Sequence, residues 1–135
     1  MADKVRTQVP PTREEIERLA GEAFLTIPEE LRRHVRNVVF CVEDFPEDDV
    51  VKEMELESPF DLLGLYRGIA LPNRSTTMLR RGNDMIFLYR RPLLEYWCET
   101  GEALSEIVRH VIVHEIGHYF GFSDEDMERI EASSG

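Results

Sequence analysis

The sequence predicts a single globular domain that contains both helices and short β-strands. The chain has 135 residues, a length typical of one domain. Hydrophobic residues make up 42% and charged residues 32%, a balance that supports a buried core and argues against a disordered chain. Segments with helical spacing of apolar residues alternate with short β-branched and aromatic runs. We expect residues 1–11 to form a flexible N-terminal arm and residues 12–135 to form the domain.

The first half of the domain is predicted to contain two helices, a strand and an acidic segment. Thr12 and Glu15 form a capping-box pattern, after which apolar residues recur at helical spacing. A second, short helix is predicted to start at Pro28, because proline suits a first helical turn. Residues 37–42, NVVFCV, read as a buried strand. The acidic segment 43–58 is expected to be a solvated loop or exposed helix, with a calcium site as a minor alternative.

The middle of the chain is predicted to supply two more strands and a helix. Residues 62–71, LLGLYRGIAL, fit an irregular or edge strand because glycines interrupt the apolar run. Residues 85–89, MIFLY, are the next predicted strand. The pair Arg91-Pro92 ends it and opens a short helix over residues 93–98, which Gly101 is expected to close.

The longest predicted helix covers residues 102–120, where apolar side chains follow a helical period. Gly121 stands where a left-handed C-terminal cap is expected. Ser123 with Asp126 three residues later then predicts the start of a final short helix.

Net charge, cysteine spacing and hydropathy indicate which partners, which cysteine state and which location to expect. The 27 acidic and 16 basic residues give a net charge of −11, which repels phosphate backbones and anionic membranes. We therefore expect neither nucleic acid nor a membrane as partner. Cys41 and Cys98 lack CxxC spacing and follow no secretory signal, so reduced packing residues are expected, with a disulfide as the alternative. With no apolar run near the ~20 residues of a membrane span, the expected location is the cytoplasm.

Three of the four histidines, His110, His114 and His118, follow one another at intervals of four residues in the longest helix. Residues four apart share one face of a helix, so His114 and His118 can bind one ion, at about 2.0–2.1 Å from each nitrogen for zinc. Glu115 is turned about a quarter of the way around the helix, where it can reach a water bound to that ion. In this way an HExxH motif binds a metal ion through its two histidines and places a glutamate beside the bound water.

A catalytic zinc needs a third protein ligand, which the same helix cannot supply. Gly121 allows the chain to turn back, since glycine adopts positive φ without a steric penalty. Three residues later, Asp124 offers a carboxylate to the same ion. The sequence therefore predicts a zinc site formed by His114, His118 and Asp124.

The string HEIGHYFGFSD, from His114 to Asp124, resembles the extended zinc motif of metzincin metallopeptidases, with aspartate where most members have a third histidine. Residues 12–132 resemble more closely the small bacterial "minimal metalloprotease" or zincin-like domains. That resemblance implies an α+β fold with a small mixed sheet, an active-site helix beneath it and a zinc ion at the cleft. It also implies His114, His118 and Asp124 as zinc ligands and Glu115 as the general base.

The sequence departs from the metzincin pattern in the residue that forms the floor of the site, beneath the zinc ion. Metzincins carry a methionine turn well downstream of the zinc motif, whereas only eleven residues follow Asp124. Met127 lies on a predicted helix, so Met85 or another apolar side chain is expected to form the floor. No residue suggests itself as an oxyanion stabiliser. His110 is expected to be a packing residue or to hold a metal ligand in position without binding the metal itself.

The tyrosines and the two arginine pairs are expected to be packing and surface residues. Tyr66, Tyr89 and Tyr119 are expected to pack, although each offers a hydroxyl to a developing oxyanion. The pairs Arg80-Arg81 and Arg90-Arg91 are expected to be surface residues.

The predicted function is zinc-dependent hydrolysis of a peptide bond in a peptide or protein substrate, with the substrate lying along an edge strand such as 62–71. One alternative is a catalytically silent zinc-binding or protein-interaction module; the presence of Glu115 favours the enzyme, because a structural zinc does not need a base. Another alternative is an RNA-processing metallohydrolase with an HGxxHxxGxDH motif. Glu115 replaces the glycine of that motif, and the acidic charge opposes RNA.

Overall fold

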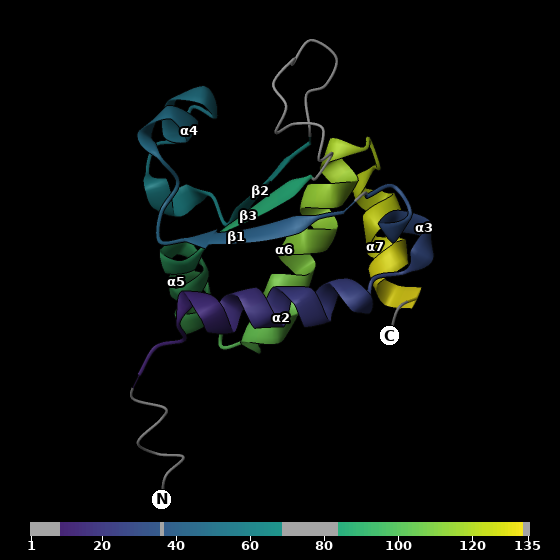
Figure 1. The fold of residues 1–135 in the computed structure, drawn as a ribbon, viewed down its shortest axis with the longest axis horizontal. Coiled ribbons are helices and arrows are strands. Elements are labelled where there is room, and N and C mark those ends of the chain that lie inside the picture. Colours follow the sequence, from purple (N-terminus) through teal and green to yellow (C-terminus); the bar gives the residue numbers. More distant parts are fainter. Residues whose placement is uncertain (1–8, 36, 69–83, 134–135) are drawn as a thin grey trace, which may run out of the picture.

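The predicted elements occur in the predicted order in the computed structural model, which describes residues 9–35, 37–68 and 84–133 (Figure 1). The helices are α2 (Arg13–Leu25), α3 (Glu29–Arg32), α4 (Asp48–Glu53), α5 (Arg90–Thr100), α6 (Leu104–Tyr119) and α7 (Asp124–Ser133), with a 3-10 turn at Pro59–Asp61. The strands are β1 (Val39–Glu43), β2 (Gly64–Arg67) and β3 (Met85–Tyr89). This is an α+β fold, as predicted.

The three strands form one mixed sheet in the order β1-β3-β2. β1 runs parallel to β3, with Val39 opposite Met85, and β2 runs antiparallel to β3, with Gly64 opposite Leu88. The edge position predicted for β2 is confirmed within its described part; residues 69–71 of the predicted strand lie outside the described residues. The prediction that β1 is a buried strand is wrong, because β1 is the other edge of the sheet and its residues are exposed or half-buried.

Helix α6 lies at the centre of the packing. It contacts α2, α3, α5, α7 and β2, and it stands beside the sheet with α7 alongside it (Figure 1). Its buried side chains meet those of α2, β3 and α7 in one core, which includes Ile16, Ala20, Ile86, Leu88, Ile107, Val108, Val111, Ile112, Ile116, Met127 and Ile130. The histidine-bearing helix is therefore held on several sides.

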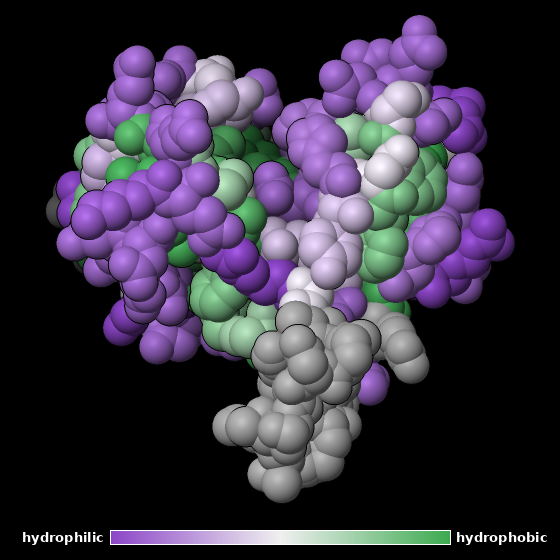
Figure 2. Space-filling model, turned by 90° about the horizontal axis from the view of Figure 1, so that it is seen from above, coloured by the Kyte–Doolittle hydropathy of each residue, from purple (hydrophilic) through white to green (hydrophobic). Residues whose placement is uncertain are grey.

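Part of the acidic segment 43–58, Asp48–Glu53, forms an exposed helix, which was one of the two predicted forms, whereas Glu43 is the last residue of β1. Helix α4 has no buried residue. Hydrophilic residues cover most of the face seen in Figure 2, on either side of a notch that separates two raised parts. Cys41 and Cys98 are free thiols, as expected, but only Cys41 is partly buried; Cys98 is exposed, so its expected role as a packing residue is wrong.

None of the helices in the described ranges combines the length and the apolar character of a membrane span. Of the flexible arm predicted for residues 1–11, residues 1–8 lie outside the described residues, as does the pair Arg80-Arg81.

Candidate metal centre

The histidine stripe of α6 faces α7 and the C-terminal turn. The rings of His114 and His118 have centroids 5.7 Å apart. Within the described part of the chain, His114 Nε2 is the buried side-chain atom left without a hydrogen bond. A buried imidazole nitrogen without a partner is costly unless something binds it, and a metal ion would do so.

The turn after α6 brings the chain back as predicted. Gly121 adopts the left-handed conformation, with φ of 84°. The Gly121 N–H donates to His118 O at 3.2 Å, and the Phe122 N–H donates to Gly117 O at 2.8 Å. These two bonds form a Schellman motif, which closes the helix and reverses the chain direction.

Asp124 is the first residue of α7 and lies beside His118. The distance from His118 Nε2 to Asp124 Oδ1 is 3.6 Å, and both side chains are largely exposed. One ligand atom from each of His114, His118 and Asp124 lies within 4.8 Å of the others. Tetrahedral zinc ligands are about 3.3 Å apart when each is about 2.0–2.1 Å from the ion, so a small adjustment would let the three bind one ion. The donor set therefore fits zinc.

Two of the three carboxylates in the first turn of α7, those of Asp124 and Asp126, have different surroundings. Asp126 belongs to a capping box with Ser123: the Asp126 N–H donates to Ser123 Oγ at 3.0 Å, and the Ser123 N–H donates to Asp126 Oδ2 at 3.3 Å. Hydrogen bonds from the backbone and the side chain of Ser123 to the Asp126 carboxylate hold the pKa of Asp126 below its usual value, with smaller help from Arg129. The cap fixes the first turn of α7 and leaves Asp124 facing His118.

Glu115 lies between one candidate ligand, His118, and the backbone of Tyr66 in strand β2. Burial raises its pKa to about 7, while the nearby His118 and a hydrogen bond from the Tyr66 backbone act in the opposite direction. Glu115 is therefore close to both His118 and strand β2.

The hydrogen-bond register explains how β2 reaches Glu115. The Tyr89 N–H donates to Leu63 O at 3.0 Å. Because the direction alternates along an antiparallel strand, Leu63 and Leu65 turn their backbone groups toward β3. Gly64 and Tyr66 turn theirs to the other side of β2, an edge that is open in that no strand of the described residues pairs with it. The Tyr66 N–H is thus free of β3 and available to the Glu115 carboxylate.

Met127, and not Met85, packs under the histidine helix. Met127 is fully buried, and its Sδ lies 2.1 Å from where a Cβ on Gly117 would be. Gly117 lies between the two histidines in sequence, so its missing side chain lets α7 approach α6 closely. Met85 stands at the start of β3, opposite Val39 and Arg67. The sequence analysis expected Met85 or another apolar side chain at the floor of the site; the apolar side chain that packs against α6 next to its histidines is that of Met127, on the helix predicted there.

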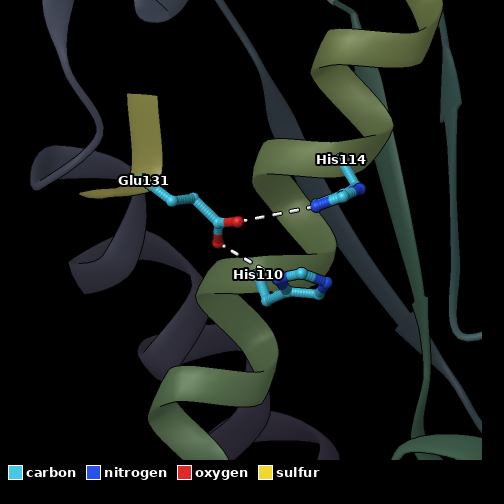
Figure 3. Close-up of side chains that lie close together, drawn as sticks. All are labelled: His110, His114 and Glu131. Atoms are coloured by element: carbon cyan, nitrogen blue, oxygen red, sulfur yellow. Dashed lines mark hydrogen bonds and ion pairs between the residues drawn. The ribbon is translucent and has the colours of Figure 1, made fainter. Parts of the chain in front are cut away.

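A residue that the sequence interpretation missed, Glu131, lies next to two of the histidines. His110 Nδ1 is 3.1 Å from Glu131 Oε2, and His114 Nε2 is 3.5 Å from Glu131 Oε1 (Figure 3). His110 is thus paired with a carboxylate instead of packing in the core. A signal was present: Glu131 follows the apolar Met127 by four residues, so both share the face of α7 that meets α6.

Burial lowers the pKa of His114, and the neighbouring His110 lowers it further, whereas Glu131 raises it. A neutral imidazole is the form that binds a metal ion.

The tyrosines occupy the positions predicted for packing residues, with one exposed. Tyr66 is buried, its hydroxyl donates to Asp84, and its pKa is raised chiefly by burial. Tyr89 is buried in the core. Tyr119 is half exposed and stacks on Tyr66, with ring centroids 4.3 Å apart.

The α+β fold, with an HExxH helix beside a small mixed sheet, is that of the zincin-like class. The family model described as zincin-like metallopeptidase matches residues 35–133. That range covers well over half of the chain, so this protein belongs to the zincin-like metallopeptidase family, which implies a bound metal. No match to a curated protein was found.

Proposed function

We propose that this protein is a zinc-dependent peptidase that hydrolyses peptide bonds. The observation that carries the proposal is the position of Glu115, whose carboxylate is close to His118 on one side and to the Tyr66 backbone on the other. A carboxylate between a metal site and an open strand edge stands where a general base is needed. Membership of the zincin-like family supports this proposal.

Each site residue has a role in the proposed reaction. His114, His118 and Asp124 would hold the zinc ion. Zinc supplies Lewis acidity toward a carbonyl group and lowers the pKa of a water molecule. Glu115 would take the proton from the attacking water and return it to the leaving amine.

The open edge of β2 would align the substrate. Gly64 and Tyr66 turn their backbone groups away from β3. The Tyr66 N–H already bonds to the Glu115 carboxylate, so an extended peptide would pair with the remaining backbone groups of these two residues as an added strand. Pairing through backbone groups places the peptide beside Glu115 without demanding a deep cleft.

The test compares the wild type, Glu115→Gln and Glu128→Gln for zinc content and for cleavage of a peptide library. Glu128 is an exposed residue of α7 and serves as the control. We expect all three proteins to retain zinc, and cleavage by Glu115→Gln to fall by about 10²–10⁴-fold, the usual contribution of a general base.

Two outcomes would contradict this function. Undiminished cleavage by Glu115→Gln would remove its role as base. Zinc-loaded wild type without any cleavage would favour the silent zinc-binding or protein-interaction module instead. An RNA substrate is disfavoured by the net charge of −11, so the proposed partner is a peptide or protein.

A further inference from the structure

His110, His114 and Glu131 converge at the contact between α6 and α7, one helical turn before the His114–His118 pair. One ligand atom from each lies within 4.8 Å of the others. Figure 3 shows the Glu131 carboxylate directed at both imidazoles, with one oxygen toward each ring. The two rings have centroids 4.0 Å apart. Two imidazoles and a carboxylate at this separation are a donor set that binds zinc and similar divalent ions.

The packing of α7 fixes this arrangement. Met127 and Ile130 are fully buried against α6, so the intervening turn of α7 has little freedom to slide. Glu131 follows Ile130 directly, and its side chain is 22% exposed. The carboxylate is therefore held near the histidines by the core and does not depend on their attraction.

A hydrogen-bonding role for Glu131 explains only part of the geometry. The 3.1 Å contact with His110 Nδ1 is a hydrogen bond, but the 3.5 Å contact leaves the buried His114 Nε2 without one. A cation among the three groups would engage all of them, including that nitrogen.

The surroundings admit a cation. A cavity of about 450 Å³ reaches His110 and Glu131, and Glu102 and Glu106 also line it. Carboxylates around a cavity raise the local concentration of positive ions. An ion that enters this cavity can therefore reach His110 and Glu131, two of the three groups.

We propose that His110, His114 and Glu131 form a second divalent-cation site, which competes with the His114–His118–Asp124 site for His114. A neutral imidazole has one acceptor nitrogen, so His114 binds one ion at a time. The chain holds one ion, in one of two positions a helical turn apart, and the second position lies farther along α6 from Glu115. An ion held at the second site would not be placed for catalysis.

The test measures zinc per chain in refolded protein, with cobalt absorption as a second readout. The wild type is compared with His118→Ala/Asp124→Asn, with His110→Ala/Glu131→Gln, and with the variant that carries all four changes; Glu128→Gln is the control. We expect one ion per chain in the wild type, the control and each double variant, and none in the quadruple variant. The two double variants should differ in their cobalt spectra, because their ligands differ.

The remaining possible results distinguish between the two sites. Loss of the ion in His118→Ala/Asp124→Asn, with retention in His110→Ala/Glu131→Gln, would overturn the second site and leave the proposed function intact. The reverse pattern would support the second site and contradict the first. Two ions per wild-type chain would overturn the competition, and none would overturn both sites.

The exposed positions of His118 and Asp124, at 57% and 84%, make the first double variant tolerant of replacement. If that variant nevertheless fails to fold, Asp124→Asn is compared with Asp124→Asn/Glu131→Gln. A further loss of zinc affinity on adding Glu131→Gln, by tenfold or more, supports the second site, and an unchanged affinity overturns it.

Discussion

Gly121 and Gly101 form a matched pair of residues. Both follow a helix in the left-handed conformation, with φ of 84° and 74°, and a Cβ at either position would meet no atom within 4 Å. They differ in what the turn leads to. Gly121 directs the chain toward Asp124, whereas Gly101 joins α5 to α6 away from the candidate ligands.

Replacing either glycine with alanine should cost about 1–2 kcal/mol of stability, the penalty of a left-handed side chain. Only Gly121→Ala should also weaken zinc binding, because it disturbs the turn that places Asp124 beside His118. Urea unfolding and zinc titration of both variants measure the two effects. Equal zinc affinities would show that the turn does not position the ligand.

Tyr89 links stability to pH at the alkaline end. Burial raises its pKa to about 12, with Glu43 adding to the effect. The folded protein thus keeps the phenolic proton at pH values where the unfolded chain has lost it. The stabilisation is fully present below about pH 10, the unfolded value, and is lost as pH rises toward the folded pKa.

We expect the stability of the wild type to fall more steeply than that of Tyr89→Phe between about pH 10 and 12, by up to about 1.4 kcal/mol per pH unit. Tyr96→Phe, at an exposed tyrosine, is the control and should follow the wild type. Denaturant unfolding at several alkaline pH values gives the slopes. Parallel slopes for wild type and Tyr89→Phe would contradict the burial effect.

At the scale of elements, α2 and α7 begin with the same kind of N-terminal cap, but only α7 carries candidate metal ligands. Glu15 N–H donates to Thr12 Oγ1 at 3.1 Å, and Thr12 N–H donates to Glu15 Oε1 at 2.7 Å. Ser123 and Asp126 make the corresponding pair of bonds at α7. The first cap anchors a helix that carries no candidate ligand, and the second anchors one that carries Asp124 and Glu131.

Thr12→Ala and Ser123→Ala should each cost about 0.5–2 kcal/mol of stability, the usual effect of removing a helix cap. We expect Ser123→Ala alone to reduce zinc affinity as well, because it loosens the turn next to Asp124. Thermal unfolding and zinc titration of the two variants separate the effects. A fall in zinc affinity of the same size in Thr12→Ala would point to general destabilisation.

Sequence patterns predicted the elements well where local chemistry determines them. The capping residues Thr12 and Ser123, and the left-handed Gly121, act within a few residues of themselves, so their roles could be read directly. The burial of β1 depends on which strands pair with it, and its place at the sheet edge is set by β3, more than forty residues away. Local composition carries no such information.

At the scale of the whole molecule, the candidate centre joins α6, α7 and the edge of β2. The histidine spacing and Asp124 were predictable, since four residues and one glycine turn connect them. Met127 and Glu131 were not, because their proximity to α6 follows from the packing of two helices across Gly117. Residues that meet through tertiary packing leave only a periodic trace in sequence.

On the proposed function, removal of zinc should destabilise the whole domain, since the candidate ligands come from two helices, α6 and α7, that pack against each other in the core. A ligand at 100 times its dissociation constant stabilises the folded state by about 2.7 kcal/mol. We expect a chelator to lower the melting temperature and added zinc to restore it. His114→Ala should melt at the same temperature with or without zinc, because both candidate sites need this histidine. A zinc-dependent shift in that variant would place the ion elsewhere.

The close approach of Met127 to Gly117 also bears on where two carboxylates of α7, those of Asp124 and Glu131, meet α6. Asp124 precedes Met127 and Glu131 follows it, so the buried thioether lies between them along the helix. Asp124 lies near His118 and Glu131 lies near His110, so the two carboxylates flank one buried contact from opposite sides.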